Sequence, residues 1–580
     1  GSNITKQSHL NSLNSLLIQD EAQGRIEPFN TFASDVFRKI SKKTSYKKMS
    51  PTEVVLNMIS NPETWQNEPI IKVANDELAN ELGAINKYVS FNQLFDFDNG
   101  GIYRLSEKVD PVYQKEQNAR SKYEKEIINL DERINICYQI FEGKLFNIFP
   151  NPKNSSEKWT APQLVVNDEK PLENEQVSMQ NTMPPKGMGG MSDEQINALM
   201  GKNSMTTVPK VENKTETLFI NYLHSVSDAY KSGNWDDADL QLNAIKNYQI
   251  QKGGQNIPSA SRINAEITYN KLNLFGKLGI VYILMGLLLL ILHLIDIFKT
   301  KHGLDKALNF AFYPFVLIFV VYTLGLAARW YISGHAPWSN GYETMIFVGW
   351  AAALSGLIFA RRSPVTLAVT GILSAIALFV ASMSWMNPEI TNLVPVLKSY
   401  WLIIHVAIIT SSYGFLAMGA LLGMLNLSLM AARTSKNKEK LKDNIQGISY
   451  IIELALMIGL LMLTVGCFIG GVWANESWGR YWGWDPKETW ALVSIIVYAA
   501  ILHLRNIPKL NNQFVLSSLA LVGFSSIIMT FYGVNYYLTG MHSYGQGTPP
   551  PFPTVVYFII VAIFALIFRA YQVEKKLGNL

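Results

Sequence analysis

The pattern of apolar and polar positions changes near residue 275. Before it, short apolar clusters alternate with many charged residues, and after it long apolar runs dominate. Nine of these runs have the length that crosses a hydrocarbon layer, and polar or basic loops separate them. They lie near 277–298, 308–328, 344–360, 364–386, 401–432, 446–470, 490–506, 513–537 and 553–570. The pattern predicts an all-α polytopic membrane protein with about nine transmembrane helices.

Lys and Arg cluster in every second loop, after the first, third, fifth and seventh spans, and again behind the last span. By the positive-inside rule these loops and the tail 573–580 are cytoplasmic, so the loop after the sixth span and the whole of 1–276 lie on the other side. An exported domain needs a signal or a preceding span, and residues 1–40 contain no sufficiently long apolar run. We therefore expect an upstream membrane segment to precede residue 1.

Helical spacing dominates the polar part of the chain and predicts a mainly helical extracytoplasmic domain. Ser50 has the place of an N-cap, with Pro51 after it and Glu53 three residues on. Residues 107–140 have the spacing of a long helix or a helical hairpin. A stretch with six methionines among Pro, Gly, Asn and Ser predicts a flexible linker, and a segment similar to one tetratricopeptide-type hairpin follows it. The expected domains are 1–174, 175–213 (linker), 214–276, 277–572 (membrane) and 573–580 (tail).

Composition excludes several classes of function. The net charge of +5 is spread over many short loops, which indicates membrane topology and no nucleic-acid partner. Of the two cysteines, Cys137 lies in the polar part and Cys467 in an apolar span, so the pair does not predict a disulfide. The chain has no Cys-x-x-Cys-His, so it is not itself a c-type cytochrome, and it has no phosphate-binding Walker loop.

The most distinctive motif lies between the sixth and seventh spans and reads WANESWGRYWGWDPKETW, from Trp473 to Trp490. Five tryptophans in this stretch exceed the one or two that anchor a helix end at the membrane surface, although such an interfacial belt remains the alternative. Tryptophans with glycines between them suit a flat platform for a planar ligand. Arg480 offers a forked cation for a carboxylate. Asp485 precedes Pro486, a pair typical of a turn, and it either helps bind the ligand or locks the loop.

Histidines flank this motif. His405 lies near the start of the fifth span and His542 follows the eighth, so both are expected on the same face as the tryptophan loop. Imidazole is the usual protein ligand of haem iron, and two such groups beside an aromatic platform can supply both axial positions. His503 lies about 20 Å along the seventh helix and is expected deep in the membrane. His293, at a similar depth in the first span, is one possible partner for His503, and an unrelated packing role is the alternative.

The tryptophan motif with its flanking histidines closely resembles the WWD signature of haem-handling membrane proteins. It is similar to the CcsA (ResC-like) half of a System II cytochrome c synthase, which is also found fused behind CcsB. The resemblance covers about residues 277–570. It implies haem delivery across the membrane and covalent attachment of haem to Cys-x-x-Cys-His segments of apocytochrome c, that is, a holocytochrome c synthase. It also implies haem b as bound substrate, and a bacterial cytoplasmic membrane with residues 1–276 and the tryptophan loop in the periplasm.

The resemblance also implies roles for individual residues. His405 and His542 correspond to the external haem-ligating pair, and His503 to an intramembrane iron ligand whose partner belongs to the upstream CcsB-like membrane segment. His335 lies in a loop that fits the family pattern GHxPxSNxYE, and we interpret it as part of a pocket wall. The expected cofactor-binding residues, besides His503, are Trp473, Trp478, Arg480, Trp482, Trp484 and Asp485. Two alternatives remain: a membrane haem chaperone without ligation activity, and a transmembrane bis-histidine redox protein.

Overall fold

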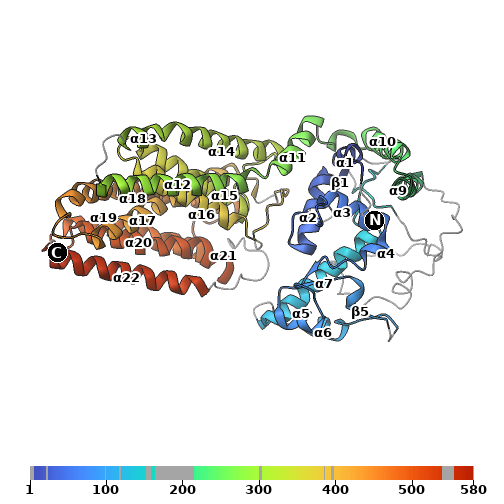
Figure 1. Ribbon diagram of the computed structural model, residues 1–580, viewed down its shortest axis with the longest axis horizontal. Coiled ribbons are helices and arrows are strands. Elements are labelled where there is room, and N and C mark those ends of the chain that lie inside the picture. Colours follow the sequence, from blue (N-terminus) through green and yellow to red (C-terminus); the bar gives the residue numbers. More distant parts are fainter. Residues whose placement is uncertain are drawn as a thin grey trace. The chain divides into compact units, whose positions relative to one another are not determined.

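The structure is a computed structural model that divides into two compact units, Gly1–Lys271 and Leu272–Leu580. It describes residues 5–20, 24–97, 100–116, 119–151, 158–162, 214–299, 304–383, 386–393, 397–538 and 554–578. Figure 1 shows the helices and strands of both units. The expected linker 175–213 lies outside the described residues.

Helices dominate the first unit, in agreement with the prediction. They are α1 (Gln7–Leu13), α2 (Phe29–Ser41), α3 (Pro51–Ser60), α4 (Pro62–Trp65), α5 (Asp76–Glu81), α6 (Ser106–Tyr113), α7 (Lys122–Phe141), α9 (Lys214–Ser232), α10 (Asp236–Lys252) and α11 (Ala260–Leu272). Three short antiparallel pairs accompany them: β1 (Leu17–Gln19) with β2 (Ile26–Pro28), β3 (Ile71–Lys72) with β4 (Tyr88–Val89), and β5 (Phe95–Asp96) with β6 (Ile102–Tyr103). Strands of two or three residues are too short to show a period-two pattern, which is why the sequence did not predict them.

Local capping explains where two of these helices begin. The Ser50 side chain accepts a hydrogen bond from the Glu53 backbone N–H at 3.3 Å, as the sequence predicted for the start of α3. Ser121 and Glu124 form a reciprocal capping box at the start of α7. The stretch 107–140 is therefore the predicted hairpin, formed by α6 and α7.

Segments from both ends of this unit share one apolar core. Phe219, Tyr222 and Val226 of α9 belong to the same buried cluster as Leu13 and Phe146. Polar contacts reinforce it: Gln249 of α10 accepts from the Leu17 N–H at 3.1 Å and donates to the Leu17 carbonyl at 2.7 Å. Residues 214–271 thus fold together with residues 5–151, so the stretches expected as separate domains pack as one body.

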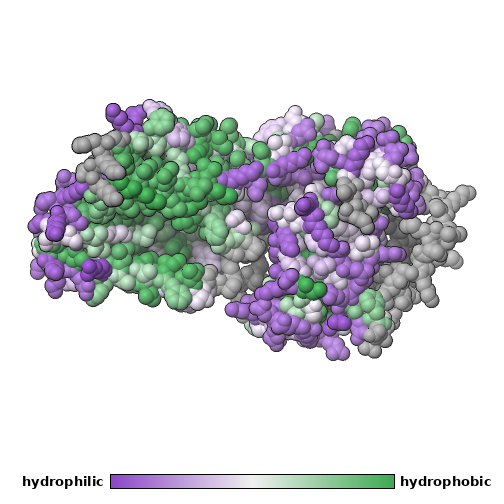
Figure 2. All heavy atoms as spheres, viewed as in Figure 1, coloured by the Kyte–Doolittle hydropathy of each residue, from purple (hydrophilic) through white to green (hydrophobic). Residues whose placement is uncertain are grey.

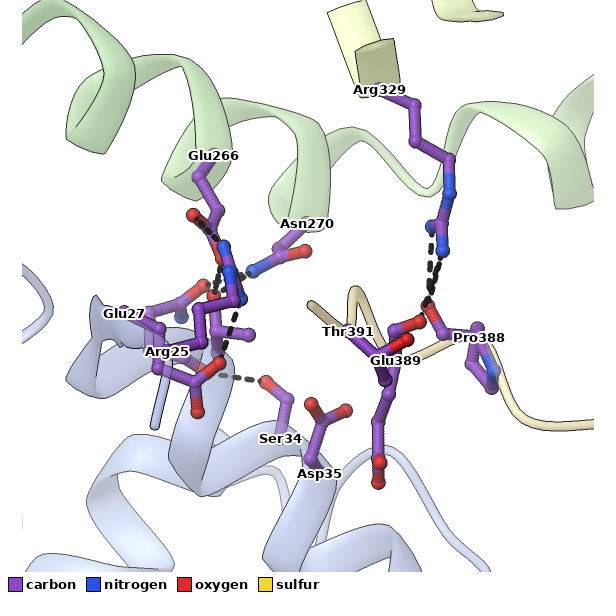
Figure 3. Close-up of polar contacts among 12 residues, drawn as sticks. Arg25, Glu27, Ser34, Asp35, Glu266, Asn270, Arg329, Pro388, Glu389 and Thr391 are labelled. Carbon is purple, nitrogen blue, oxygen red and sulfur yellow. Dashed lines mark hydrogen bonds and ion pairs between the residues drawn. The ribbon is translucent and has the colours of Figure 1, made fainter. Parts of the chain in front are cut away.

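A buried charged cluster attaches α11 to this body. Arg25 donates to Glu27 at 2.8 Å and to Glu266 of α11 at 2.5 Å (Figure 3). Thr31 donates to the second oxygen of Glu266 at 2.7 Å. The Arg25 guanidinium therefore pairs with two carboxylates from segments far apart in the chain, so each buried carboxylate has a counter-charge.

The second unit is a bundle of apolar helices. They are α12 (Leu274–Lys299), α14 (Phe312–Ser333), α15 (Gly341–Phe359), α16 (Val365–Ala381), α17 (Tyr400–Ala431), α18 (Lys438–Trp478), α19 (Pro486–His503), α20 (Gln513–Ile528) and α22 (Thr554–Lys576), with the short α13 (Leu304–Phe310) before α14. Within the described chain eight helices are long and apolar enough to cross a membrane, and α16 is a shorter apolar helix. The predicted all-α polytopic membrane protein is confirmed, and hydrophobic side chains cover most of the visible face of this unit (Figure 2).

Helix α17 is the most buried span and packs on α15, α18, α20 and α22. It approaches α18 closely because glycines, which have no side chain, lie at the contact. A Cβ at Gly459 would lie 2.5 Å from Leu416, and one at Gly466 would lie 2.5 Å from Ile409. This close packing sets the position of the residues that α17 and α18 present to each other.

Two helices near the tryptophan motif extend beyond the apolar runs 446–470 and 490–506. Helix α18 runs on to Trp478, so Trp473 lies in a helix rather than in a loop, and α18 ends where Gly479 adopts a left-handed conformation with φ of 71°. Helix α19 begins at Pro486, before the apolar run that starts near residue 490. The interhelical loop is thus only 479–485. These helix extensions contain polar residues, so apolar composition alone does not reveal them.

The eighth span is not a uniform α-helix. Helix α20 passes into a π-helical turn, Met529–Gly533, and then into α21 (Val534–Tyr537). Thr530 in this turn donates to the Trp490 carbonyl at 3.1 Å and thereby ties the turn to the start of α19. Single π-helical turns occur frequently at functional sites, and Phe531 of this turn lines a pocket.

Candidate functional site

An open pocket of about 930 Å³, counting its solvent-filled mouth, lies in the second unit at one end of α15, α17, α19 and α21. Its wall is mostly apolar and aromatic, with a few polar groups among them, which is the usual composition of a small-molecule site. The aromatic, basic and amide side chains of this wall include Trp338, His405, Tyr413, Lys487, Phe531 and Asn535.

His405 is a well-oriented imidazole in this wall. Its Nδ1 lies 2.7 Å from the Gly466 carbonyl oxygen of α18, and a carbonyl can only accept, so Nδ1 carries the proton. The neutral ring then has its lone pair on Nε2. A histidine that donates its other ring N–H to a backbone carbonyl is the usual arrangement of a metal ligand, because the bond fixes both tautomer and orientation.

Glycines of α18 make room for this ring. A Cβ on Gly470 would overlap His405 Cε1, so no other residue fits there without moving the imidazole. At the next residue, a Cβ on Gly471 would lie 3.1 Å from the Tyr481 carbonyl oxygen of the tryptophan loop. His405 and the loop therefore approach α18 at consecutive positions, a link that the sequence analysis did not identify.

The tryptophans of the motif lie in different environments. Trp473 is only 1% exposed and packs edge-on against Trp478, with ring centroids 4.8 Å apart. Trp482 and Trp484 form a similar pair at 5.9 Å, and Trp484 is 71% exposed with a left-handed φ of 55°. None of the five belongs to the described lining of the His405 pocket, where Trp338, Tyr413 and Phe531 supply the aromatic wall.

The loop is closed by a capping box. Asp485 accepts from the Lys487 and Glu488 backbone N–H groups at 2.9 and 3.4 Å, and Glu488 accepts from the N–H groups of Gly483 and Asp485 at 2.7 and 3.3 Å. Both carboxylates are thus engaged by backbone donors. Arg480 is exposed and folds over Gly483, where a Cβ would lie 2.8 Å from the guanidinium carbon.

Lys487, in the first turn of α19, extends into the pocket. Its Nζ donates to Asn535 Oδ1 of α21 at 2.9 Å and lies 5.8 Å from the centre of the Phe531 ring. No pattern in the sequence assigned Lys487 to a binding site. Only the contact with α21, 48 residues away, shows that it faces the same pocket as His405.

A buried ionic network supports the part of the pocket wall that the start of α15 forms. Arg329 of α14 pairs with Glu343 of α15 at 2.7 Å, with side chains 1% and 0% exposed. The guanidinium also donates to the carbonyls of Pro388 and Glu389 at 3.1 Å each (Figure 3). Arg329 was missed in the sequence, although an arginine beside an apolar run was a usable signal.

The same network positions the loop that carries the GHxPxSNxYE pattern. Glu343 accepts from the backbone N–H and hydroxyl of Ser339 at 2.9 and 2.6 Å, and His335 donates through Nε2 to the Thr391 carbonyl at 2.9 Å. Trp338 donates to the Ile403 carbonyl of α17 at 3.1 Å, two residues before His405. These bonds give His335 a role in holding the pocket wall.

The remaining candidate histidines lie elsewhere. His503 is the last residue of α19; its side chain is exposed, and Nδ1 donates to the Ala499 carbonyl at 2.7 Å. A second, polar pocket beside it is lined by Leu502, Arg505 and Glu453 among others. His293 is buried in α12, which packs mainly on α16, whereas α19 packs on α18 and α20. His542 lies outside the described residues.

Comparison with known proteins assigns the chain to a family. The cytochrome C assembly protein family matches residues 338–542. Cytochrome c biogenesis protein CcsA of Prochlorococcus marinus (strain MIT 9301) is 34% identical over 306 residues, which cover 48% of this chain and 96% of that protein. The chain belongs to the CcsA family of cytochrome c biogenesis proteins. CcsA of Guillardia theta is 35% identical over 256 residues, covering 40% of this chain and 83% of that protein.

A longer relative covers nearly the whole chain. Protein NrfI of Wolinella succinogenes is 37% identical over 537 residues, 92% of this chain and 54% of NrfI, so the chain spans about half the length of that relative. Among solved structures, cytochrome c heme lyase CcmF aligns over 52% of this chain and 50% of its own with a TM-score of 0.36 and 16% identity, too weak a likeness to support an argument.

The family assignment confirms the resemblance to CcsA. The matched region 338–542 contains the loop with Trp338, His405, the tryptophan motif and His503, and it ends at His542. The CcsA part of the chain is therefore the part that contains the pocket.

Proposed function

We propose that this CcsA-family protein delivers haem across the membrane and attaches it covalently to Cys-x-x-Cys-His segments of apocytochrome c. The observation that carries the proposal is the imidazole of His405. It lines an apolar pocket, and the Gly466 carbonyl fixes the tautomer that an iron ligand requires.

In this proposal His405 and His542 are the two axial ligands of the haem iron. Trp473, Trp478, Trp482 and Trp484, with Arg480 and Asp485, form or support the platform beside it. The burial of Trp473 and the bonds of Asp485 favour supporting roles for these two, and the exposed ring of Trp484 favours direct contact with a ligand. His503 is the proposed ligand of an incoming haem, paired with a group from an upstream CcsB-like membrane segment.

Haem b is the substrate here, and the bond-forming step needs no nucleophile from this chain. A cysteine thiol adds across a haem vinyl group: sulfur bonds to one vinyl carbon, the thiol hydrogen goes to the other, and the double bond becomes single. Nothing leaves, and there is no net oxidation or reduction. The chain's contribution is positional, because the imidazole holds the macrocycle and the apolar wall excludes water while the thiols approach.

The proposed topology follows from the basic loops. The bacterial cytoplasmic membrane holds the apolar helices, the tryptophan loop and residues 1–276 face the periplasm, and the C-terminus is cytoplasmic. His405, in the second turn of α17 after Ser399 and Tyr400, then lies near the periplasmic surface, where apocytochrome c is available.

The test is co-expression with an apocytochrome that carries one Cys-x-x-Cys-His segment, with covalent haem stain and the haem spectrum of the purified chain as readouts. We expect the wild type to give stained cytochrome and His405→Ala to give none, with added imidazole restoring part of the stain by replacing the lost ligand. His224→Ala is the matched control, because His224 is an exposed histidine of the first unit.

Full attachment by His405→Ala would overturn the ligand assignment. Haem-loaded wild type without attachment would instead indicate a haem chaperone.

A further inference from the structure

Lys487 is the basic residue in the described lining of the His405 pocket. It lies in the first turn of α19, and its ammonium group contacts α21. Its hydrogen-bond acceptor is the neutral amide oxygen of Asn535, at 2.9 Å. A strongly hydrated cation has thus been placed in a largely apolar wall with an amide dipole as its partner.

No carboxylate of the described residues lies within ion-pair distance of this ammonium group. The two nearest in sequence, Asp485 and Glu488, accept hydrogen bonds from backbone N–H groups in the capping box. The stretches 394–396 and 539–553 contain no Asp or Glu, so they cannot supply one either. Asp485 attracts the ammonium group from beyond that distance. A half-buried cation with no carboxylate in direct contact is still costly, which makes Lys487 a candidate for binding an anionic ligand.

We propose that Lys487 and Asn535 together bind a propionate carboxylate of the haem that His405 holds, an inference that rests on the proposed function. Lys487 supplies the charge, and the Asn535 amide, whose oxygen accepts from Lys487, still has two N–H donors for a carboxylate oxygen. A metalloporphyrin with carboxylate side chains offers a metal ion to His405 and an anion to Lys487. Arg480, the cation that the sequence suggested for this task, folds over Gly483 on the exposed side of the loop.

This contact also selects the reactive edge of the substrate. The propionates and vinyl groups of haem lie on opposite edges of the macrocycle. Anchoring a propionate at Lys487 therefore turns the vinyl groups away from α19 and α21, so that they remain available to the thiols of an apocytochrome. Lys487 is thus a binding and orienting residue for the attachment reaction.

The experiment compares haem with haem dimethyl ester, which keeps the iron, the ring and the vinyl groups but has no carboxylate charge. The purified full chain is titrated with each compound, and the change in the haem spectrum gives Kd; the signal of His405→Ala is subtracted as non-specific binding. We expect the wild type to bind haem about 10- to 100-fold more tightly than the ester, the range for one charge-assisted hydrogen bond.

Three variants separate the possible causes. Lys487→Gln is expected to bind the two compounds equally, with its affinity for the ester unchanged, which also shows that the pocket is folded. Lys487→Arg keeps the charge and should keep the preference for haem. Lys398→Gln removes a lysine next to the pocket-lining Leu397 and should behave as wild type.

The outcomes distinguish this inference from the function on which it rests. Wild type that binds haem through His405 but shows no preference over the ester overturns the role of Lys487 and leaves the proposed function intact. A preference that survives in Lys487→Gln, or one that Lys398→Gln also loses, overturns it too. Wild type that binds neither compound above the His405→Ala background overturns both proposals.

Discussion

The orientation of His405 depends on glycines of the facing helix rather than on its own neighbours in sequence. Gly466 supplies the carbonyl that accepts from Nδ1, and Gly470 leaves the space that the ring occupies. Gly447 lies in the same helix but in open space, because a Cβ added there would meet no atom within 4 Å. The two kinds of helical glycine therefore allow a matched comparison.

We expect Gly470→Ala to displace the His405 imidazole, because the added methyl group would overlap Cε1 of the ring. Loss of ligand orientation typically lowers metal affinity or activity about 10- to 100-fold. Covalent haem attachment and the spectrum of bound haem measure the effect. Gly447→Ala should leave both unchanged and raise helix stability by about 0.5–1 kcal/mol. Equal attachment by the two alanine variants would show that Gly470 does not position the ring.

At the scale of elements, the pocket wall depends on a contact among α14, α15 and the segment 386–391. Arg329 joins all three, because its guanidinium bonds to Glu343 and to two backbone carbonyls. Glu343 in turn holds Ser339, so the loop before α15 is fixed to the same centre. A buried pair of this kind positions helices more than it stabilises them, because its desolvation offsets most of its attraction.

Removing one member of the pair is expected to be much more harmful than removing both. Arg329→Met leaves Glu343 as an uncompensated buried charge and should cost about 3–5 kcal/mol of stability. Thermal unfolding in detergent, followed by tryptophan fluorescence, is the measurement. The double variant Arg329→Met, Glu343→Leu should recover a large part of the loss. If the single variant unfolds at the wild-type temperature, the pair does not hold these helices together.

At the scale of the whole molecule, side-chain contacts between residues more than two hundred positions apart join the start and the end of the first unit. His9 of α1 is buried; Nδ1 lies 2.7 Å from Asp239 and Nε2 lies 3.0 Å from the Tyr222 hydroxyl. The ring also packs on Trp235 at 4.8 Å. Burial lowers the pKa of the His9 imidazole below its ordinary value of 6.5, although Asp239 acts in the opposite direction.

A lowered pKa in the folded state means that the unfolded chain binds the proton more readily. The stabilisation by His9 is therefore fully present above pH 6.5 and decreases as the pH falls toward the folded-state pKa. We expect His9→Gln to unfold at a lower temperature than the wild type at pH 7.5, with a smaller difference between them at pH 5. His224→Gln, at an exposed histidine, should show no such change. A difference that stays constant from pH 7.5 to 5 would contradict this role of His9.

The spans could be predicted because composition alone identifies them: each of the nine apolar runs corresponds to a helix. The cap at Ser50 could also be predicted, since a cap involves residues within three positions of each other. The polar ends of α18 and the π-helical turn at Met529–Gly533 were not, because neither changes the apolar pattern. The sequence identified His405 as a candidate because this histidine flanks the tryptophan motif. It did not identify Gly466 as the hydrogen-bond partner of His405.

The sequence by itself therefore determined the class of the protein, the number of apolar helices and the family to which its motif points. These properties follow from composition and spacing within a turn or a span, which are local. The tertiary structure decided which groups meet. His405 is oriented by Gly466, 61 residues away, and Lys487 turns to Asn535, 48 residues away. Such pairs depend on how whole helices pack, and no local pattern in the chain records that packing.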